Sequence, residues 1–155
     1  MRWELPPIIK VYEALGAIAD KRIEVKGGTA IVVSSSGDKR YEVRYDPESR
    51  AISANDNGSY WQGYLGYPSI AFLMRKGILS FDGAIATSLK EIEWKKINTR
   101  FKNNFEKTES FVLEVAEKRG VPREKITAFT EKIINEIREL GPEKFGATKK
   151  PPRGS

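Results

Sequence analysis

Apolar residues recur along the chain with two different spacings. From Arg40 to Tyr45 they alternate with charged residues, so that Tyr41, Val43 and Tyr45 share one face, as in a strand with one buried side. Shorter runs between turn residues predict further strands at residues 22–26, 29–35 and 50–54. The short connections predict an antiparallel meander of four strands, with residues 59–64 as either a loop or a fifth strand.

Spacings of three and four residues, typical of helices, precede and follow these strands. They predict helices over residues 7–19, 68–76 and 122–140. Ser88 and Glu91 have the spacing of a capping box, and neither glycine nor proline follows until Gly120. We therefore predict one long helix over Leu89–Arg119, with a break at Asn103–Asn104 or at Thr108–Ser110 as the alternative.

These elements predict an α+β fold. An N-terminal helix precedes a four- to five-stranded antiparallel β-meander, and the helices that follow end in a C-terminal antiparallel helical hairpin. We expect residues 1–141 to form a single domain and residues 142–155, rich in Lys, Pro and Gly, to be a disordered basic tail. At ~1.5 Å per residue the long helix would extend roughly 46 Å. Because a compact chain of this size would not cover such a helix, we expect Trp94 and Ile97 to be covered either by the sheet or by a second subunit in a homodimer through this helix.

Composition removes several classes of chemistry. The 155 residues include no cysteine and no histidine, which excludes thiol nucleophiles, Ser-His-Asp catalysis and His- or Cys-ligated metals. We expect neither a cofactor nor a metal, and the lack of cysteine favours an intracellular, cytoplasmic setting. Charged residues make up 31% of the chain, a balance found in proteins from hot environments. No apolar run is long enough to span a membrane.

The segment Asn55–Pro68 combines aromatic rings with glycines and short polar side chains. Rings and hydrogen-bonding groups together suit a pocket for a sugar, a nucleobase or a peptide. The candidate ligand-binding residues are Asn55, Asp56, Asn57, Tyr60, Trp61, Gln62, Tyr64 and Tyr67. The alternative is that the rings complete the core where the sheet meets the helices, while Asn-Asp-Asn-Gly forms a turn.

A second candidate site consists of the basic residues of the long predicted helix. Lysine and arginine bind phosphates without regard to sequence, and the net charge of +6 favours a polyanionic partner. The candidate nucleic-acid-binding residues are Lys90, Lys95, Lys96, Arg100, Lys102 and Lys107. A solvated helix face has the same pattern.

Two weaker patterns involve catalysis. Ser36 and Lys39 have the Ser-x-x-Lys spacing of some acyl-enzymes, but they straddle a hairpin turn, whereas that motif begins a helix. Asp56 and Asp82 flank the aromatic rings, and they are candidates for paired catalytic carboxylates or for binding a divalent ion.

We therefore expect a small intracellular binding or interaction protein without catalytic activity. One alternative is a nucleic-acid-binding module that uses the basic helix and exposed aromatic rings. The other is an enzyme that acts without histidine or cysteine, through carboxylates near the aromatic segment.

Overall fold

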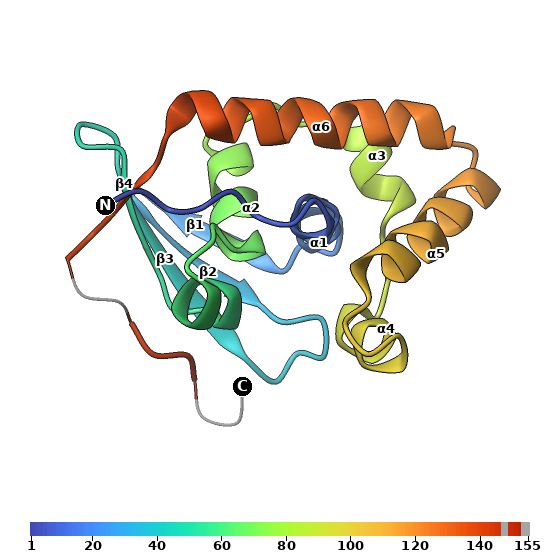
Figure 1. Cartoon of the computed structure of the whole chain (residues 1–155), viewed down its shortest axis with the longest axis horizontal. Helices are drawn as coiled ribbons and strands as arrows, with labels where there is room; N and C mark the ends of the chain where they lie inside the picture. The colour runs from blue at the N-terminus through green and yellow to red at the C-terminus, as the bar shows by residue number, and fades with distance from the viewer. Residues whose placement is uncertain (147–148, 153–155) are drawn as a thin grey trace.

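The fold is mixed α+β, with a five-stranded sheet beside a group of helices (Figure 1). The structure is a computed structural model that describes residues 1–146 and 149–152. The strands follow the order β1-β2-β3-β4-β5 across the sheet. Their bounds are Ile23–Lys26 (β1), Thr29–Val33 (β2), Arg40–Asp46 (β3), Ala51–Ala54 (β4) and Glu143–Lys144 (β5). Strands β1 to β4 pair antiparallel in chain order, as the sequence predicts.

The alternation in β3 has the predicted orientation. Tyr41, Val43 and Tyr45 are buried, while the charged residues at 40, 42 and 44 are exposed. The apolar face of the sheet contacts α2, which lies between the sheet and α6 (Figure 1).

The fifth strand comes from a different part of the chain than expected. Residues 59–64 do not form it; the short segment Glu143–Lys144 does, and it pairs parallel to β4. The amide of Glu143 donates to Arg50 O at 2.9 Å. Ordered structure therefore continues past Gly141, where we expected a disordered tail to begin. Residues 147–148 and 153–155 of that tail lie outside the described residues, and the division into one domain and a tail stays a prediction.

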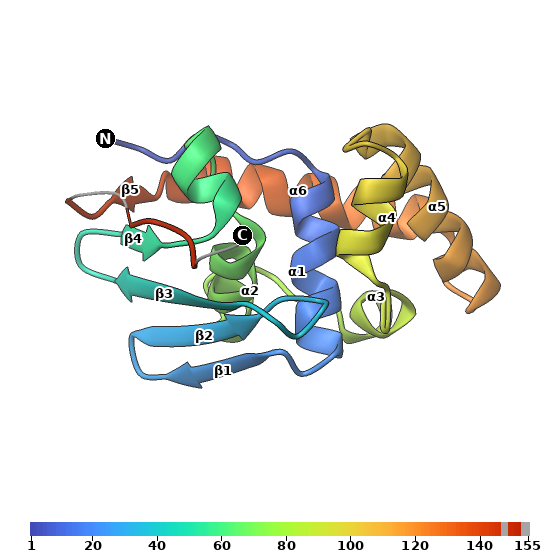
Figure 2. The ribbon, with the colours of Figure 1, turned by 90° about the horizontal axis from the view of Figure 1, so that it is seen from below.

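The helices surround α1, which is buried along most of its length. In Figure 2, α1 separates the sheet from α3, α4 and α5. Their bounds are Ile9–Ala19 (α1), Tyr67–Arg75 (α2), Gly83–Ser88 (α3), Trp94–Arg100 (α4), Phe105–Lys118 (α5) and Arg123–Leu140 (α6). No helix within the described ranges is long and apolar enough to cross a membrane.

The single helix predicted over Leu89–Arg119 is wrong, and the alternative break near Asn103–Asn104 is correct. Lys102 and Asn103 both have positive φ, which ends helical geometry. Asn104 then caps α5, its side chain accepting a hydrogen bond from Lys107 N at 3.2 Å. Ser88 is not an N-cap, because it is the last residue of α3 and its hydroxyl donates to Ile85 O.

The break removes the geometric argument for a dimer. Trp94, which we expected either the sheet or a second subunit to cover, is only 3% exposed within its own chain. Helices α5 and α6 contact each other across a short connection. The antiparallel hairpin that we expected of them stays a prediction.

Candidate functional site

The aromatic segment folds into a π-helix, η1 (Gly58–Gln62), instead of a strand. The buried carboxylate of Asp56 holds its first turn, accepting from Ser59 N at 3.2 Å and from Ser59 Oγ at 2.6 Å. The turn after η1 needs glycine at Gly63, whose φ of 74° lies in the left-handed region. The segment is therefore fixed by specific contacts at both ends.

The four predicted rings of this segment separate into two pairs. Trp61 is 67% exposed, and its ring meets that of Tyr60 edge-on, with centroids 4.6 Å apart. Tyr64 and Tyr67 are half-buried, and the ring of Tyr67 meets Tyr41 edge-on at 6.4 Å. The four rings, which we predicted to share a single site, therefore lie in two different environments.

A polar cleft of about 250 Å³ lies beside the start of this segment, where Asp56, Asn57 and Gly58 line it. Its walls are α1, the β2–β3 hairpin tip, the residues before η1, and α4. The lining residues are Lys10, Glu13, Arg22, Ser34, Ser35, Ser36, Asp38, Lys39, Tyr41, Asp56, Asn57, Gly58, Tyr67, Trp94, Lys95, Asn98, Thr99 and Asn103.

One wall of the cleft carries a chain of polar contacts between helices. Lys10 Nζ pairs with Glu13 Oε2 at 2.8 Å, and both side chains are largely buried. Asn98 Nδ2 donates to Glu13 Oε1 at 3.1 Å. Burial lowers the pKa of Lys10, but chiefly the charge and hydrogen bond of Glu13 outweigh it and leave the pKa above its ordinary value. Lys10 is therefore a permanent cation in the cleft.

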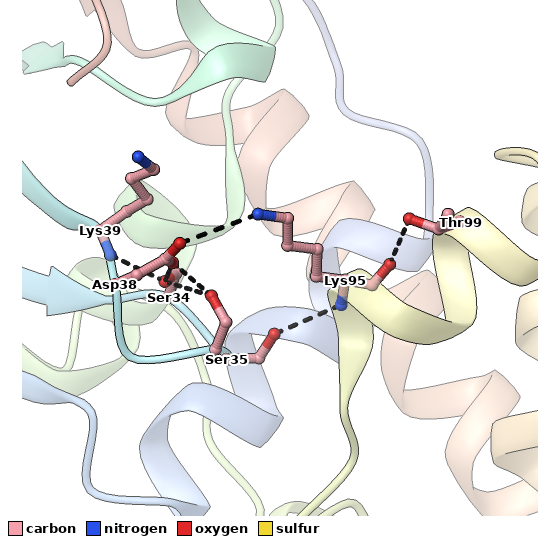
Figure 3. Close-up of polar contacts among 7 residues, drawn as sticks. Ser34, Ser35, Asp38, Lys39, Lys95 and Thr99 are labelled. Carbon is pink, nitrogen blue, oxygen red and sulfur yellow. Dashed lines mark hydrogen bonds and ion pairs between the residues drawn. The ribbon is translucent and has the colours of Figure 1, made fainter. Parts of the chain in front are cut away.

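The hairpin tip forms the opposite wall and is joined to α4 (Figure 3). The hydroxyls of Ser34 and Ser36 both donate to the Asp38 carboxylate. The bond from Ser36, with further help from Ser34 and Lys95, lowers the pKa of Asp38.

Lys95 bridges the two walls. Its Nζ lies 3.9 Å from Asp38 Oδ2, and its amide donates to Ser35 Oγ at 3.3 Å (Figure 3). These two contacts are long, and both partners of the ion pair are more than half exposed, so solvent weakens the bridge.

Buried polar atoms without hydrogen bonds concentrate around this cleft. Among the described residues there are five, and four of them belong to lining residues: Glu13, Arg22, Asn57 and Trp94. Glu13 Oε2 and Arg22 Nε do have ion-pair partners. Asn57 Oδ1 and Trp94 Nε1 have neither kind of contact. Trp94 Nε1 is packed against Gly16 of α1, 2.8 Å from the place that a Cβ on Gly16 would occupy. Because proteins satisfy most buried polar groups, the remaining atom, Asn57 Oδ1, marks a place on the lining where a ligand would complete the bonding.

The predicted ligand set is only partly brought together. Asp56, Asn57 and Tyr67 line the cleft. Asn55 accepts from Glu42 N at 2.8 Å and so belongs to the sheet edge. Tyr60, Trp61, Gln62 and Tyr64 do not line the cleft, since they follow the turn of η1 away from it.

The predicted basic residues do not lie on one helix, because that helix is broken. Only Lys95 lines the polar cleft. Lys96 and Arg100 border a neighbouring groove with Ile97 and Phe111. Lys90, Lys102 and Lys107 lie in the turn after α3, the turn after α4, and the first turn of α5.

Sequence reasoning missed the cleft residues Lys10, Glu13, Arg22 and Asn98. A signal for two of them was present, because Lys10 and Glu13 are the only charged residues between Ile8 and Ala19. Asp82, by contrast, caps α3 by accepting from Ile85 N, which is a structural role. Across the described ranges, His, Cys, Asp and Glu side chains form no group of three that could hold a metal ion.

Comparison with known proteins identifies a family and no closer relative. No curated protein and no solved structure matches the chain. The model of one family, described as uncharacterised conserved protein UCP014422, matches residues 3–143. That match covers most of the 155 residues, and the chain therefore belongs to this family.

Proposed function

We propose that this is a binding protein whose cleft holds a small polar molecule with an anionic group. The observation that carries the proposal is the group of four cationic side chains on the lining of one cleft, Lys10, Arg22, Lys39 and Lys95, together with the buried, unsatisfied Asn57 Oδ1. Asn57 Oδ1 is an acceptor, so a ligand that also carries a hydrogen-bond donor would satisfy it.

The charge of the cleft favours an anionic group on the ligand. Its lining includes four cations, Lys10, Arg22, Lys39 and Lys95, and three acids, Glu13, Asp38 and Asp56. Burial raises the pKa of Asp56, so that this acid resists ionisation. The remaining charge is positive and lies in a partly enclosed space, where electrostatic attraction is stronger than in bulk water.

The size of the cleft limits the ligand. A volume of about 250 Å³ is below the ~300–1,000 Å³ typical of sites for drug-sized molecules. Small carboxylates, amino acids and small phosphorylated molecules are compatible with it, whereas a nucleotide would have to extend into solvent.

Binding accounts for the carboxylates better than catalysis does. Asp56 lies within the aromatic segment, but both of its oxygens accept hydrogen bonds from Ser59. That arrangement stabilises the first turn of η1. Asp82, the other expected catalytic carboxylate, is the cap of α3.

The experiment is calorimetric titration of the protein with inorganic phosphate, sulfate, amino acids and small carboxylates. We expect one of these classes to bind, and Lys95→Ala to weaken it roughly tenfold, the loss typical of one charge-assisted hydrogen bond. Lys118→Ala is the matched control, because Lys118 is an exposed helical lysine outside the cleft.

A second pair of variants tests the buried atoms. Asn57→Ala and Ser69→Ala each remove a buried polar group that makes no hydrogen bond, but only Asn57 lines the cleft. Asn57→Ala should weaken binding and Ser69→Ala should not. Equal affinity in all four variants, or no binding of any ligand class, would contradict the proposal.

A further inference from the structure

The π-helix η1 displays one tryptophan on the surface in a fixed position. Trp61 is 67% exposed, more than any other tryptophan or phenylalanine among the described residues. Tyr60 packs edge-on against its ring and limits its rotation. π-Helices are rare and frequently occur at functional sites.

The backbone beneath Trp61 is constrained at several points. A Cβ on Gly58 would overlap the ring of Tyr64, so only glycine fits there. Glu4 binds the far end of the turn, its amide donating to Gly63 O at 3.0 Å. The exposed ring is therefore preorganised, and a partner would not have to order it on binding.

A cation lies beside the turn that follows Trp61. Lys144 Nζ lies over the ring of Trp3, 4.8 Å from its centroid, and 3.6 Å from the place that a Cβ on Gly63 would occupy, and Gly63 is two residues from Trp61. After Glu143 the sequence contains Lys144, Lys149, Lys150 and Arg153 and no acidic residue. Figures 1 and 2 both show the described chain after β5 running past the turn between β4 and α2. Glu4 lies on the segment that pairs with Tyr64, after the turn that follows η1. It is acidic, but the cations outnumber it.

We propose that Trp61 and the lysines after Glu143 form a binding surface for single-stranded nucleic acid. The indole would stack on a base, since every base offers a π face, and the lysines would contact phosphates. This surface does not involve the polar cleft, because Trp61 and Lys144 do not line it. It also differs from the basic helix expected from the sequence, which does not exist as one helix.

The test is fluorescence anisotropy of labelled oligothymidylate and oligouridylate with the full chain. Trp61→Ala should weaken binding roughly 5- to 150-fold, which corresponds to ~1–3 kcal/mol for one stacked base. Trp61→Phe keeps a ring and should retain part of the affinity. Phe81→Ala is the control, because Phe81 is also an exposed ring, at 45%, in another part of the fold.

Salt dependence tests the lysines separately. In binding to a single strand, each phosphate contact adds about 0.7 to the steepness of the fall of log K with log salt concentration. The double variant Lys149→Ala, Lys150→Ala should lower that slope by up to about 1.4, and Lys132→Ala, an exposed lysine of α6, should leave it unchanged.

Three results would overturn the inference. Wild-type affinity in Trp61→Ala would exclude stacking, and an unchanged slope in the lysine variant would exclude phosphate contacts. Binding to phosphatidylserine vesicles in place of oligonucleotides would assign the surface to a membrane. Because Trp61 is exposed, Trp61→Ala should keep the wild-type melting temperature. A lowered melting temperature would therefore show that the variant is misfolded.

Discussion

The carboxylate of Asp56 lies against the Cα of Gly66, so closely that a Cβ on Gly66 would overlap it. Gly66 has an ordinary backbone, with φ −80° and ψ 169°, and glycine is required there for space and not for conformation. This contact ties the residue whose carboxylate binds Ser59 in the first turn of η1 to the N-cap residue of α2. The π-helix, the cleft and the start of α2 therefore depend on one close approach.

Replacing Gly66 should reveal that dependence. Gly66→Ala forces Asp56 to move within a buried site, and overpacking of this kind costs ~1–3 kcal/mol. Urea unfolding should show the loss. Gly83→Ala is the matched control, because a Cβ there meets only an ordinary contact at 3.8 Å with Phe81, and alanine favours helix. Equal stability of the two variants would contradict the contact.

Replacement by alanine should change the free energy of unfolding strongly at one tryptophan and hardly at another. Trp94 is 3% exposed and packs against Gly16, whereas Trp61 is 67% exposed. Trp94→Ala should lower the free energy of unfolding by ~3–5 kcal/mol, and Trp61→Ala should change it by less than about 0.5 kcal/mol. Chemical denaturation followed by circular dichroism measures both. A large loss at Trp61 would place its ring in the core.

The buried carboxyl of Asp56 should make stability depend on pH. Burial raises its pKa in the folded state above the ordinary value of 3.8. Below that value the carboxyl is protonated in both states, and as pH rises the unfolded state ionises first, so this group costs stability with rising pH. The advantage of wild type over Asp56→Asn should therefore be greater at about pH 4 than at about pH 7. An advantage that grows toward neutral pH would show that Asp56 is stabilised as an anion.

Arg119 should hold the end of α3 to α5. Its Nη1 donates to Ser88 O at 3.0 Å and to Lys90 O at 2.6 Å. Arg119→Met keeps much of the side-chain volume but leaves these carbonyls without the donor, which should cost ~1–3 kcal/mol in thermal or urea unfolding. Lys118→Met removes a neighbouring charge that makes no such bond and should be nearly neutral. A similar loss in both variants would point to net charge instead.

Much of the fold was predictable because its strands and first helix follow simple periods. The alternation from Arg40 to Tyr45 predicted β3 and its buried face. The break between α4 and α5 was harder to predict, because Lys102 and Asn103 adopt left-handed φ without a glycine. Strand β5 was not predictable, since two residues give no period and pair only because α6 delivers them to β4.

The site was less predictable than the fold. Its residues come from separate segments, and only packing brings Lys10 of α1 and Lys95 of α4 to one cleft. The aromatic segment indicated the correct neighbourhood, since Asp56, Asn57 and Tyr67 do line the cleft. A turn of η1 nevertheless carries Trp61 to another surface, and the spacing of the rings does not predict a π-helix.

The most direct test of a ligand in the cleft is amide chemical-shift mapping by NMR with each class of small anion. If a ligand binds in the cleft, the amide chemical shifts should change with saturation, chiefly at Asn57, Lys95 and the Ser34–Lys39 turn. The chemical shifts of amides near Trp61 and along the exposed face of α6 should not change. Absence of saturable shifts, or shifts that centre on residues outside the cleft, would contradict it.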